Sequence, residues 1–189
     1  MKTVYIAMSA DLLTPGHVSL IQEAKMMGDV VIGLLIDSAI ASYQRLPYMR
    51  YEERKVVLEA IAGVKEVLPQ ETLDYVPNLL NIKPDFVLNR DDWNTGVLRE
   101  NRDRVINVLS QWGGELIESN HMPGITAEAL NRSIRDVGVT PQRRLGMLKR
   151  LVEAKPLLRI IEAHSGLTGL IAETVSVQSG NDVREFDGI

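Results

Sequence analysis

Short apolar segments alternate with amphipathic segments through the first two thirds of the chain, and this alternation limits the possible folds. Apolar runs of about 4–8 residues are typical of buried strands, whereas apolar residues spaced by three or four indicate helices. The sequence predicts strands over Thr3–Met8, Val30–Ile36, Val64–Leu68, Asp85–Leu88 and Glu115–Ile117, and helices over Pro15–Met27, Tyr51–Ile61, Leu73–Leu80 and Val97–Trp112. Such alternation gives parallel strands with right-handed crossovers and helices on both faces. We therefore expect a doubly wound α/β sheet with a helical extension at its C-terminal end.

The junction between the first strand and the first helix, residues 8–17, has the composition of an anion-binding loop. Pro15 suits the first helical turn, because its missing N–H would have no intrahelical partner there. Gly16 allows close approach of a ligand to the backbone, and His17 projects from the same turn. Free amides and the positive end of the helix dipole attract anions. The junction therefore predicts a phosphate site beyond the carboxyl end of a parallel strand.

The composition is typical of a globular domain, with 45% hydrophobic and 24% charged residues. A net charge of −4 argues against non-specific nucleic-acid binding as the main task, and the lack of cysteine excludes disulfides and thiolate chemistry. We find no membrane-spanning run and no signal-peptide pattern, so we expect a cytoplasmic protein that binds neither nucleic acid nor membrane. The first strand is not followed by Gly-x-Gly-x-x-Gly, and Gly-Lys-Ser/Thr is missing, which argues against dinucleotide dehydrogenases and Walker-type kinases.

A basic segment begins after the last predicted strand. Between Arg132 and Arg159 the chain has eight Lys and Arg residues against two acidic ones. Pro141 disfavours helix at the residue before it and favours a helix start after it, so we expect one domain at 1–137 and a second segment at 138–189. Two interpretations of the basic residues stay open: a solvated connecting helix, or a docking surface for an acidic partner or phosphate.

Residues Ala10–His17 read Ala-Asp-Leu-Leu-Thr-Pro-Gly-His and resemble the His-x-Gly-His signature of nucleotidyltransferases, most closely its cytidylyltransferase version. In that family both histidines contact the triphosphate and stabilise the charge on the departing pyrophosphate. His17 matches the second histidine, and Thr14 stands in place of the first. The resemblance covers about residues 1–135 and implies a Rossmann-like nucleotidyltransferase fold, CTP with Mg²⁺ as nucleotide substrate, and a homodimer.

Further segments resemble other parts of the family's nucleotide site. Leu88–Trp93 resembles the His-Gly-Asp-Asp-Trp segment, and Met122–Ala129 resembles the Ile-Ser-Ser-Thr helix start. The resemblance implies catalytic roles for His17 and Thr14, nucleotide contacts from Ala10, Asp11, Gly16, Asp91, Asp92, Trp93, Ile125 and Thr126, acceptor or phosphate contacts from Arg45 and Arg54, and no metal ligand from the protein.

Some of these residues have a second interpretation. Arg45 either contacts phosphate or faces solvent, and Arg54, which follows Glu53 on a helix, also fits a structural ion pair. Arg90 replaces the glycine of the family segment, and we expect its side chain to obstruct close approach of a ligand to the backbone. Ala127 and Glu128 replace hydroxyl-bearing residues, and a carboxylate at Glu128 would repel a triphosphate.

Within the family, four phrases resemble the domain that is fused ahead of phosphoenolpyruvate mutase in phosphonate biosynthesis: Ile40–Tyr43, Leu46–Tyr48, Pro69–Tyr75 and Trp112–Leu116. Leu158–Leu170 resembles the opening strand and helix of the mutase, and Arg184–Ile189 resembles its second strand. These segments are only the beginning of a (β/α)₈ barrel, so we expect no mutase activity.

The resemblance implies transfer of CMP from CTP to a small phosphonate, such as 2-aminoethylphosphonate or 2-hydroxyethylphosphonate, with release of pyrophosphate. The departures at Thr14, Arg90 and Glu128 favour a second hypothesis. In that alternative the domain is catalytically inactive and serves as a nucleotide-binding, dimerisation or scaffold module.

Overall fold

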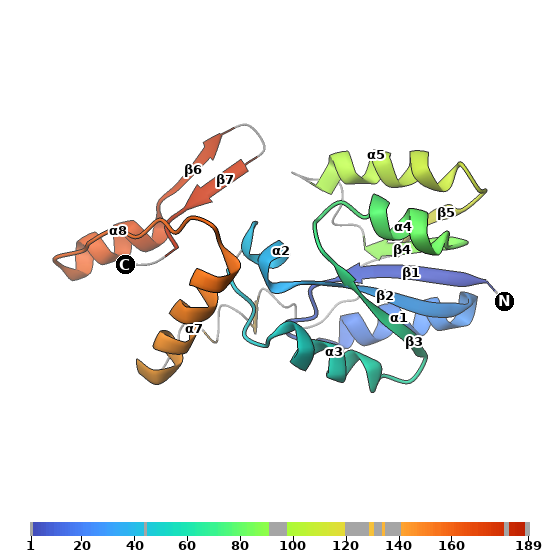
Figure 1. Cartoon of the computed structure of the whole chain (residues 1–189), viewed down its shortest axis with the longest axis horizontal. Helices are drawn as coiled ribbons and strands as arrows, with labels where there is room; N and C mark the ends of the chain where they lie inside the picture. Colours follow the sequence, from blue (N-terminus) through green and yellow to red (C-terminus); the bar gives the residue numbers. More distant parts are fainter. Residues whose placement is uncertain are drawn as a thin grey trace.

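Five parallel strands form the centre of the molecule, and a set of C-terminal elements follows them (Figure 1). The computed structural model describes residues 2–43, 45–90, 98–119, 129–130, 134, 141–179 and 182–187. The strands are β1 (Thr3–Met8), β2 (Asp29–Leu35), β3 (Val64–Gln70), β4 (Phe86–Arg90), β5 (Glu115–Ser119), β6 (Ser176–Ser179) and β7 (Asp182–Glu185). The helices are α1 (Pro15–Met27), α2 (Asp37–Ala41), α3 (Tyr51–Glu59), α4 (Val76–Ile82), α5 (Leu98–Leu109), α7 (Pro141–Ala154) and α8 (Gly166–Thr174).

The sheet has the strand order β3-β2-β1-β4-β5, and every neighbouring pair is parallel. This confirms the doubly wound α/β fold, and each predicted strand is present with ends that differ by a few residues at most. The chain runs outward from β1 to β3 and then crosses back to β4 on the other side of β1. The direction of winding therefore reverses between β1 and β4, and ligands of such sheets bind beyond the carboxyl ends of the strands at this point.

Alternate side chains of the strands supply two separate cores. Val4 and Ile6 face α1 and α3, whereas Tyr5 and Ala7 face α4 and α5 on the opposite side (Figure 1). Each helical layer closes its core with buried leucines, such as Leu58 on α3 and Leu79 on α4. Because alternate side chains of β1 point to opposite faces of the sheet, helices cover both faces and the domain has three layers.

The C-terminal elements are short segments of helix and strand. Of the strand expected within Leu158–Leu170, Ile160 alone forms a bridge, and the helix of this stretch is α8. Arg184 and Glu185 lie in β7, which pairs antiparallel with β6 in a two-stranded hairpin. The backbone N–H of Asp187, just after β7, donates to the carbonyl of Arg159 at 2.7 Å, so the two segments that resemble mutase strands meet at this point. The resemblance to the start of the mutase stays a prediction.

The proposed boundary at 137/138 falls outside the described residues, and α7 begins at Pro141 as the sequence predicts. No helix in the described part of the chain is long and apolar enough to cross a membrane.

Candidate nucleotide site

The loop that follows β1 is held in place by the carboxylate of Asp11. Oδ1 of Asp11 accepts the backbone N–H of Tyr48 at 2.6 Å and that of Met49 at 3.2 Å, and Oδ2 accepts Nη2 of Arg45 at 2.6 Å. The preceding residue, Ala10, is buried and has a left-handed backbone with φ of 49°, which is uncommon for a residue with a side chain. Asp11 is buried, so this carboxylate ties the loop to residues 45–49.

Arg45 neither faces open solvent nor projects freely into the site. Its Nη1 donates to the carbonyl of Leu46 at 2.5 Å, and its guanidinium lies 3.8 Å from the centre of the Tyr48 ring. Together with the ion pair to Asp11, these contacts fix the guanidinium at the edge of the loop. A phosphate contact from Arg45 would have to share the guanidinium with Asp11.

Arg54 has a structural role. Its side chain is completely buried, and Nη2 forms an ion pair with Oδ1 of Asp37 at 2.7 Å. Its Nη1 donates to the carbonyl of Ser9, and its Nε donates to that of Met49 at 3.2 Å. Protein acceptors therefore use all three nitrogens of the guanidinium, as in a structural ion pair, and a phosphate contact from Arg54 stays a prediction.

The first turn of α1 brings Thr14 and His17 together. Thr14 precedes the helix, and its carbonyl accepts the backbone N–H of His17 at 2.9 Å. The imidazole folds back over Thr14, so that Nδ1 accepts the backbone N–H of Thr14 at 3.1 Å and lies 2.9 Å from the Thr14 hydroxyl. Since Nδ1 acts as acceptor, the neutral ring carries its proton on Nε2, which is then the donor of the pair.

His17 is held in its neutral form. Burial lowers the pKa of His17, and the positive charge of Arg90 lowers this pKa further. A neutral ring with the proton on Nε2 donates one hydrogen bond and adds no full charge to the site. The side chain of Thr14 is buried in contact with His17, and as a hydroxyl it cannot supply the second imidazolium of the family signature.

Arg90, the last residue of β4, extends across the switch point to α1. Its Nη2 donates to the carbonyl of Gly16. A Cβ added at Gly16 would lie only 2.7 Å from Nη1 of Arg90, so a side chain at this position would displace the guanidinium. The glycine at position 16 is thus matched to an arginine at position 90, a contact that local sequence pattern does not reveal.

Five of the residues expected to contact the nucleotide lie outside the described residues: Asp91, Asp92, Trp93, Ile125 and Thr126. The same holds for Ala127 and Glu128, so the expected repulsion from Glu128 stays a prediction.

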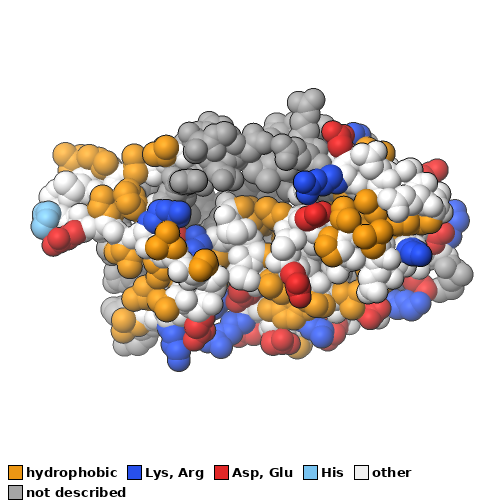
Figure 2. All heavy atoms as spheres, turned by 45° about the horizontal axis from the view of Figure 1, so that its top comes forward, with side chains coloured by type: hydrophobic (Ala, Val, Ile, Leu, Met, Phe, Trp, Pro, Cys, Tyr) orange, Lys and Arg blue, Asp and Glu red, His pale blue; other side chains and the backbone are white. Residues whose placement is uncertain are grey.

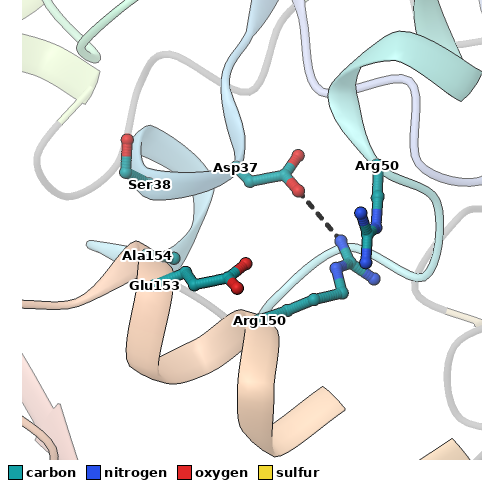
Figure 3. A pocket seen from close by; sticks show the side chains of 6 residues that line it. All are labelled: Asp37, Ser38, Arg50, Arg150, Glu153 and Ala154. Carbon is teal, nitrogen blue, oxygen red and sulfur yellow. Dashed lines mark hydrogen bonds and ion pairs between the residues drawn. The ribbon is translucent and has the colours of Figure 1, made fainter. Parts of the chain in front are cut away.

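A second polar centre joins α7 to the sheet region, and the sequence analysis did not identify it. Nη2 of Arg150 forms an ion pair with Oδ2 of Asp37 at 2.9 Å, and Nη1 donates to the carbonyl of Tyr48 at 3.2 Å. Figure 3 shows the open pocket of about 250 Å³ between α2 and α7, into which Arg50 and Glu153 also project. One carboxylate, Asp37, therefore holds both Arg54 and Arg150. At least one arginine of the basic segment thus forms an intramolecular contact, which neither sequence interpretation anticipated.

Among the described residues, no three His, Cys, Asp or Glu side chains gather in one place. Mg²⁺ in nucleotide sites is commonly held by one or two carboxylates and by the phosphates of the substrate. The carboxylate of Asp11, in the loop before α1, is already bonded to an arginine and two amides.

Comparison with known proteins agrees with this architecture. Residues 9–131 match the model of the cytidylyltransferase-like family. Glycerol-3-phosphate cytidylyltransferase of Bacillus subtilis is 34% identical over 95 residues, which are 49% of this chain and 74% of that enzyme. FAD synthase of Ferroglobus placidus is 31% identical over 87 residues, which are 46% of this chain and 57% of that enzyme.

A solved structure supports the same fold. The lipopolysaccharide core biosynthesis protein of Thermoplasma volcanium superposes with a TM-score of 0.54, at 17% identity, over 66% of this chain and 99% of that protein. The family model covers more than half of the chain, and strands β2 to β5 of the parallel sheet, the α1 turn and His17 lie within the matched residues. The chain therefore belongs to the cytidylyltransferase-like family of nucleotidyltransferases.

Proposed function

We propose that this protein transfers CMP from CTP to a small phosphonate or phosphate ester and releases pyrophosphate. The observation that carries the proposal is the first turn of α1, where His17 presents an Nε2 donor at the switch point of the sheet. The relatives named above act on glycerol 3-phosphate and make FAD, so small phosphorylated acceptors are common to this group. The similarity to domains fused with phosphoenolpyruvate mutase favours a phosphonate as acceptor here.

The reaction requires little covalent chemistry from the protein. An acceptor oxygen attacks the α-phosphorus of CTP, a new O–P bond forms, and the bond to the β-phosphate oxygen breaks as pyrophosphate leaves with its electron pair. Catalysis is then mainly positioning and charge stabilisation. His17 donates from Nε2 to a phosphate oxygen, and the amides and dipole of α1 attract the same anion. Magnesium enters with CTP and offsets part of its negative charge.

The experiment is a pyrophosphate-release assay with Mg²⁺–CTP and, separately, 2-aminoethylphosphonate, 2-hydroxyethylphosphonate and glycerol 3-phosphate. We expect turnover with one of the phosphonates that exceeds turnover with glycerol 3-phosphate. His17→Ala removes a preorganised donor and should lower the rate about 10²–10³-fold. A wild-type rate equal to background with all three acceptors would contradict the proposal.

A second candidate function is a nucleotide-binding or scaffold module without catalysis, which Thr14 favours because a neutral hydroxyl stands at the position of the first histidine. The same assay with Thr14→His separates the two. If the wild-type chain is inactive and this variant releases pyrophosphate, the domain is a binding module that has lost one charged group. Turnover by the wild-type chain excludes the scaffold alternative.

A further inference from the structure

The end of β4 places a cation where a nucleotide-binding site needs one. Arg90 extends from the sheet to the first turn of α1 and donates to the carbonyl of Gly16. It lies close enough to His17 that its charge lowers the pKa of the imidazole. The guanidinium thus reaches the turn that also holds Thr14, the residue in place of the family's first histidine.

This cation is not neutralised by the described part of the chain. No carboxylate among the described residues forms an ion pair with Arg90, whereas Arg45, Arg54 and Arg150 each have one. The Nε of Arg90 is buried and finds no hydrogen-bond partner among the described residues. A cation beside the positive end of a helix dipole is also unfavourable unless an anion is added.

We infer that Arg90 is a phosphate-binding residue for the triphosphate of the nucleotide, and that it supplies the positive charge which Thr14 cannot. This inference rests on the proposed function and adds a residue to it. The guanidinium is bound to Gly16, the residue before His17 in the same turn of α1, so we expect one phosphate group to accept hydrogen bonds from both side chains. Thr14 orients the ring of His17, and Arg90 provides the permanent charge.

The inference reverses the expectation that Arg90 obstructs the site. An obstructing side chain would weaken nucleotide binding, so replacing it with glycine would strengthen binding. A phosphate-binding arginine requires the opposite result. The two interpretations therefore differ in the sign of a single measured change.

The test is calorimetric titration of the full chain with Mg²⁺–CTP and with CMP, which lacks the two outer phosphates. We expect Arg90→Gln and Arg90→Gly to weaken CTP binding about 10–100-fold, because each removes charge-assisted hydrogen bonds, and to change CMP binding by less than about threefold. Arg90→Lys should fall in between. Arg104→Gln is the matched control, since Arg104 is an exposed residue of α5 paired with Asp74, and it should bind CTP as the wild type does.

CTP binding by Arg90→Gly that equals or exceeds that of the wild type would overturn the role of Arg90 and leave the proposed function intact. A wild-type chain that binds no CTP would overturn the proposed function together with this inference. A measurement on the wild-type chain does not depend on whether the variants fold. The Nε–H NMR resonance of Arg90 should shift on addition of CTP and should not shift on addition of CMP. An unchanged resonance under saturating CTP would also contradict the inference.

Discussion

The sheet domain (residues 3–119) and the C-terminal segment (residues 141–187) differ in how they treat apolar side chains. In the sheet domain the central strands β1, β2 and β4 are buried on both faces, and two cores form. In the C-terminal segment Ala172 is the one buried hydrophobic residue among those that the structure describes. Its large apolar side chains are exposed instead: Leu145, Leu148, Val152, Leu157, Ile160, Leu167, Leu170, Ile171, Val175, Val177 and Phe186. Figure 2 shows these orange groups spread over the end of the molecule that the C-terminal elements form.

The comparison teaches that the two regions are stabilised by different forces. Burial of apolar surface stabilises the sheet domain, where Leu34 and Leu58 are completely inaccessible. Ion pairs hold the C-terminal segment, with Arg150 bound to Asp37 at one end and Lys155 bound to Asp187 at the other. Mutations of apolar residues should therefore be severe in the first region and mild in the second.

The largest difference is expected from matched leucine truncations. Leu34→Ala leaves a cavity in the β2 core and should lower the free energy of unfolding by about 2–5 kcal/mol. Leu167→Ala removes an exposed side chain on α8 and should change it by less than about 0.5 kcal/mol. Urea unfolding followed by tryptophan fluorescence measures both, since Trp112 anchors to the carbonyl of Pro84 in the sheet domain. Equal losses in the two variants would show that the C-terminal segment has a buried core after all.

A smaller difference is expected at Asp37, the carboxylate that the two regions share. Asp37→Asn deprives buried Arg54 of its anion and should cost about 1.5–3 kcal/mol of sheet-domain stability. Arg150→Met breaks only the bond to α7 and should cost less than about 1 kcal/mol, while making α7 more sensitive to limited proteolysis. The reverse order of the two losses would contradict the structural role given to Arg54.

The sequence predicts the sheet domain well because its signals are local. Strand runs, helical spacing and the Pro15–His17 turn each depend on neighbouring residues, and all reappear in the structure. The partners of Asp11 and Arg54 could not be predicted, because they are distant in the sequence. Asp11 binds residues more than thirty positions further along the chain, and Arg54 binds Asp37 and the carbonyl of Ser9, in the loop after β1. The contact between Arg90 and Gly16 likewise depends on the order of β1 and β4 in the sheet.

The C-terminal segment was predicted less well for a related reason. A strand forms only where another strand pairs with it, and around Ile160 the described residues show a single bridge and one backbone hydrogen bond, from Asp187 to Arg159. Within Leu158–Leu170 the helix that the resemblance suggests is present as α8, and the strand is reduced to one bridge in the described part of the chain.

The titration of His17 measures how its surroundings in the site change the pKa of the imidazole. Its folded-state pKa lies below the ordinary value of about 6.5, so the unfolded chain binds more protons than the folded chain as pH falls below 6.5. The neutral ring of His17 therefore adds to the free energy of unfolding above pH 6.5. This contribution is lost as the pH falls through the pKa of His17 in the folded state. An NMR titration of the ring should give a midpoint below 6.5, and Arg90→Gln should raise it, whereas Arg104→Gln should not. A midpoint above 6.5 would contradict the buried neutral ring.

The smallest effect is expected at Asp187 in the C-terminal segment. Burial alone raises the pKa of Asp187, but hydrogen bonds from Lys155 and the backbone of Arg159, together with their positive charges, outweigh it and lower the pKa. The stability from this carboxylate is therefore present above its unfolded pKa of about 3.9 and is lost as pH falls through the lower folded value. Hydrogen exchange should show faster opening of the C-terminal segment in Asp187→Asn at pH 6 than in the wild type. Identical exchange would mean that Lys155 and Asp187 contribute nothing to holding the segment.

The most direct test of the central claim is the melting temperature of the sheet domain with and without Mg²⁺–CTP, followed by tryptophan fluorescence. If His17 and the first turn of α1 bind the triphosphate, CTP at about 100 times its dissociation constant should raise the melting temperature by about 5–10 °C. The same concentration should have a much smaller effect on His17→Ala. No rise at millimolar CTP, or an equal rise in the wild type and in His17→Ala, would contradict the account.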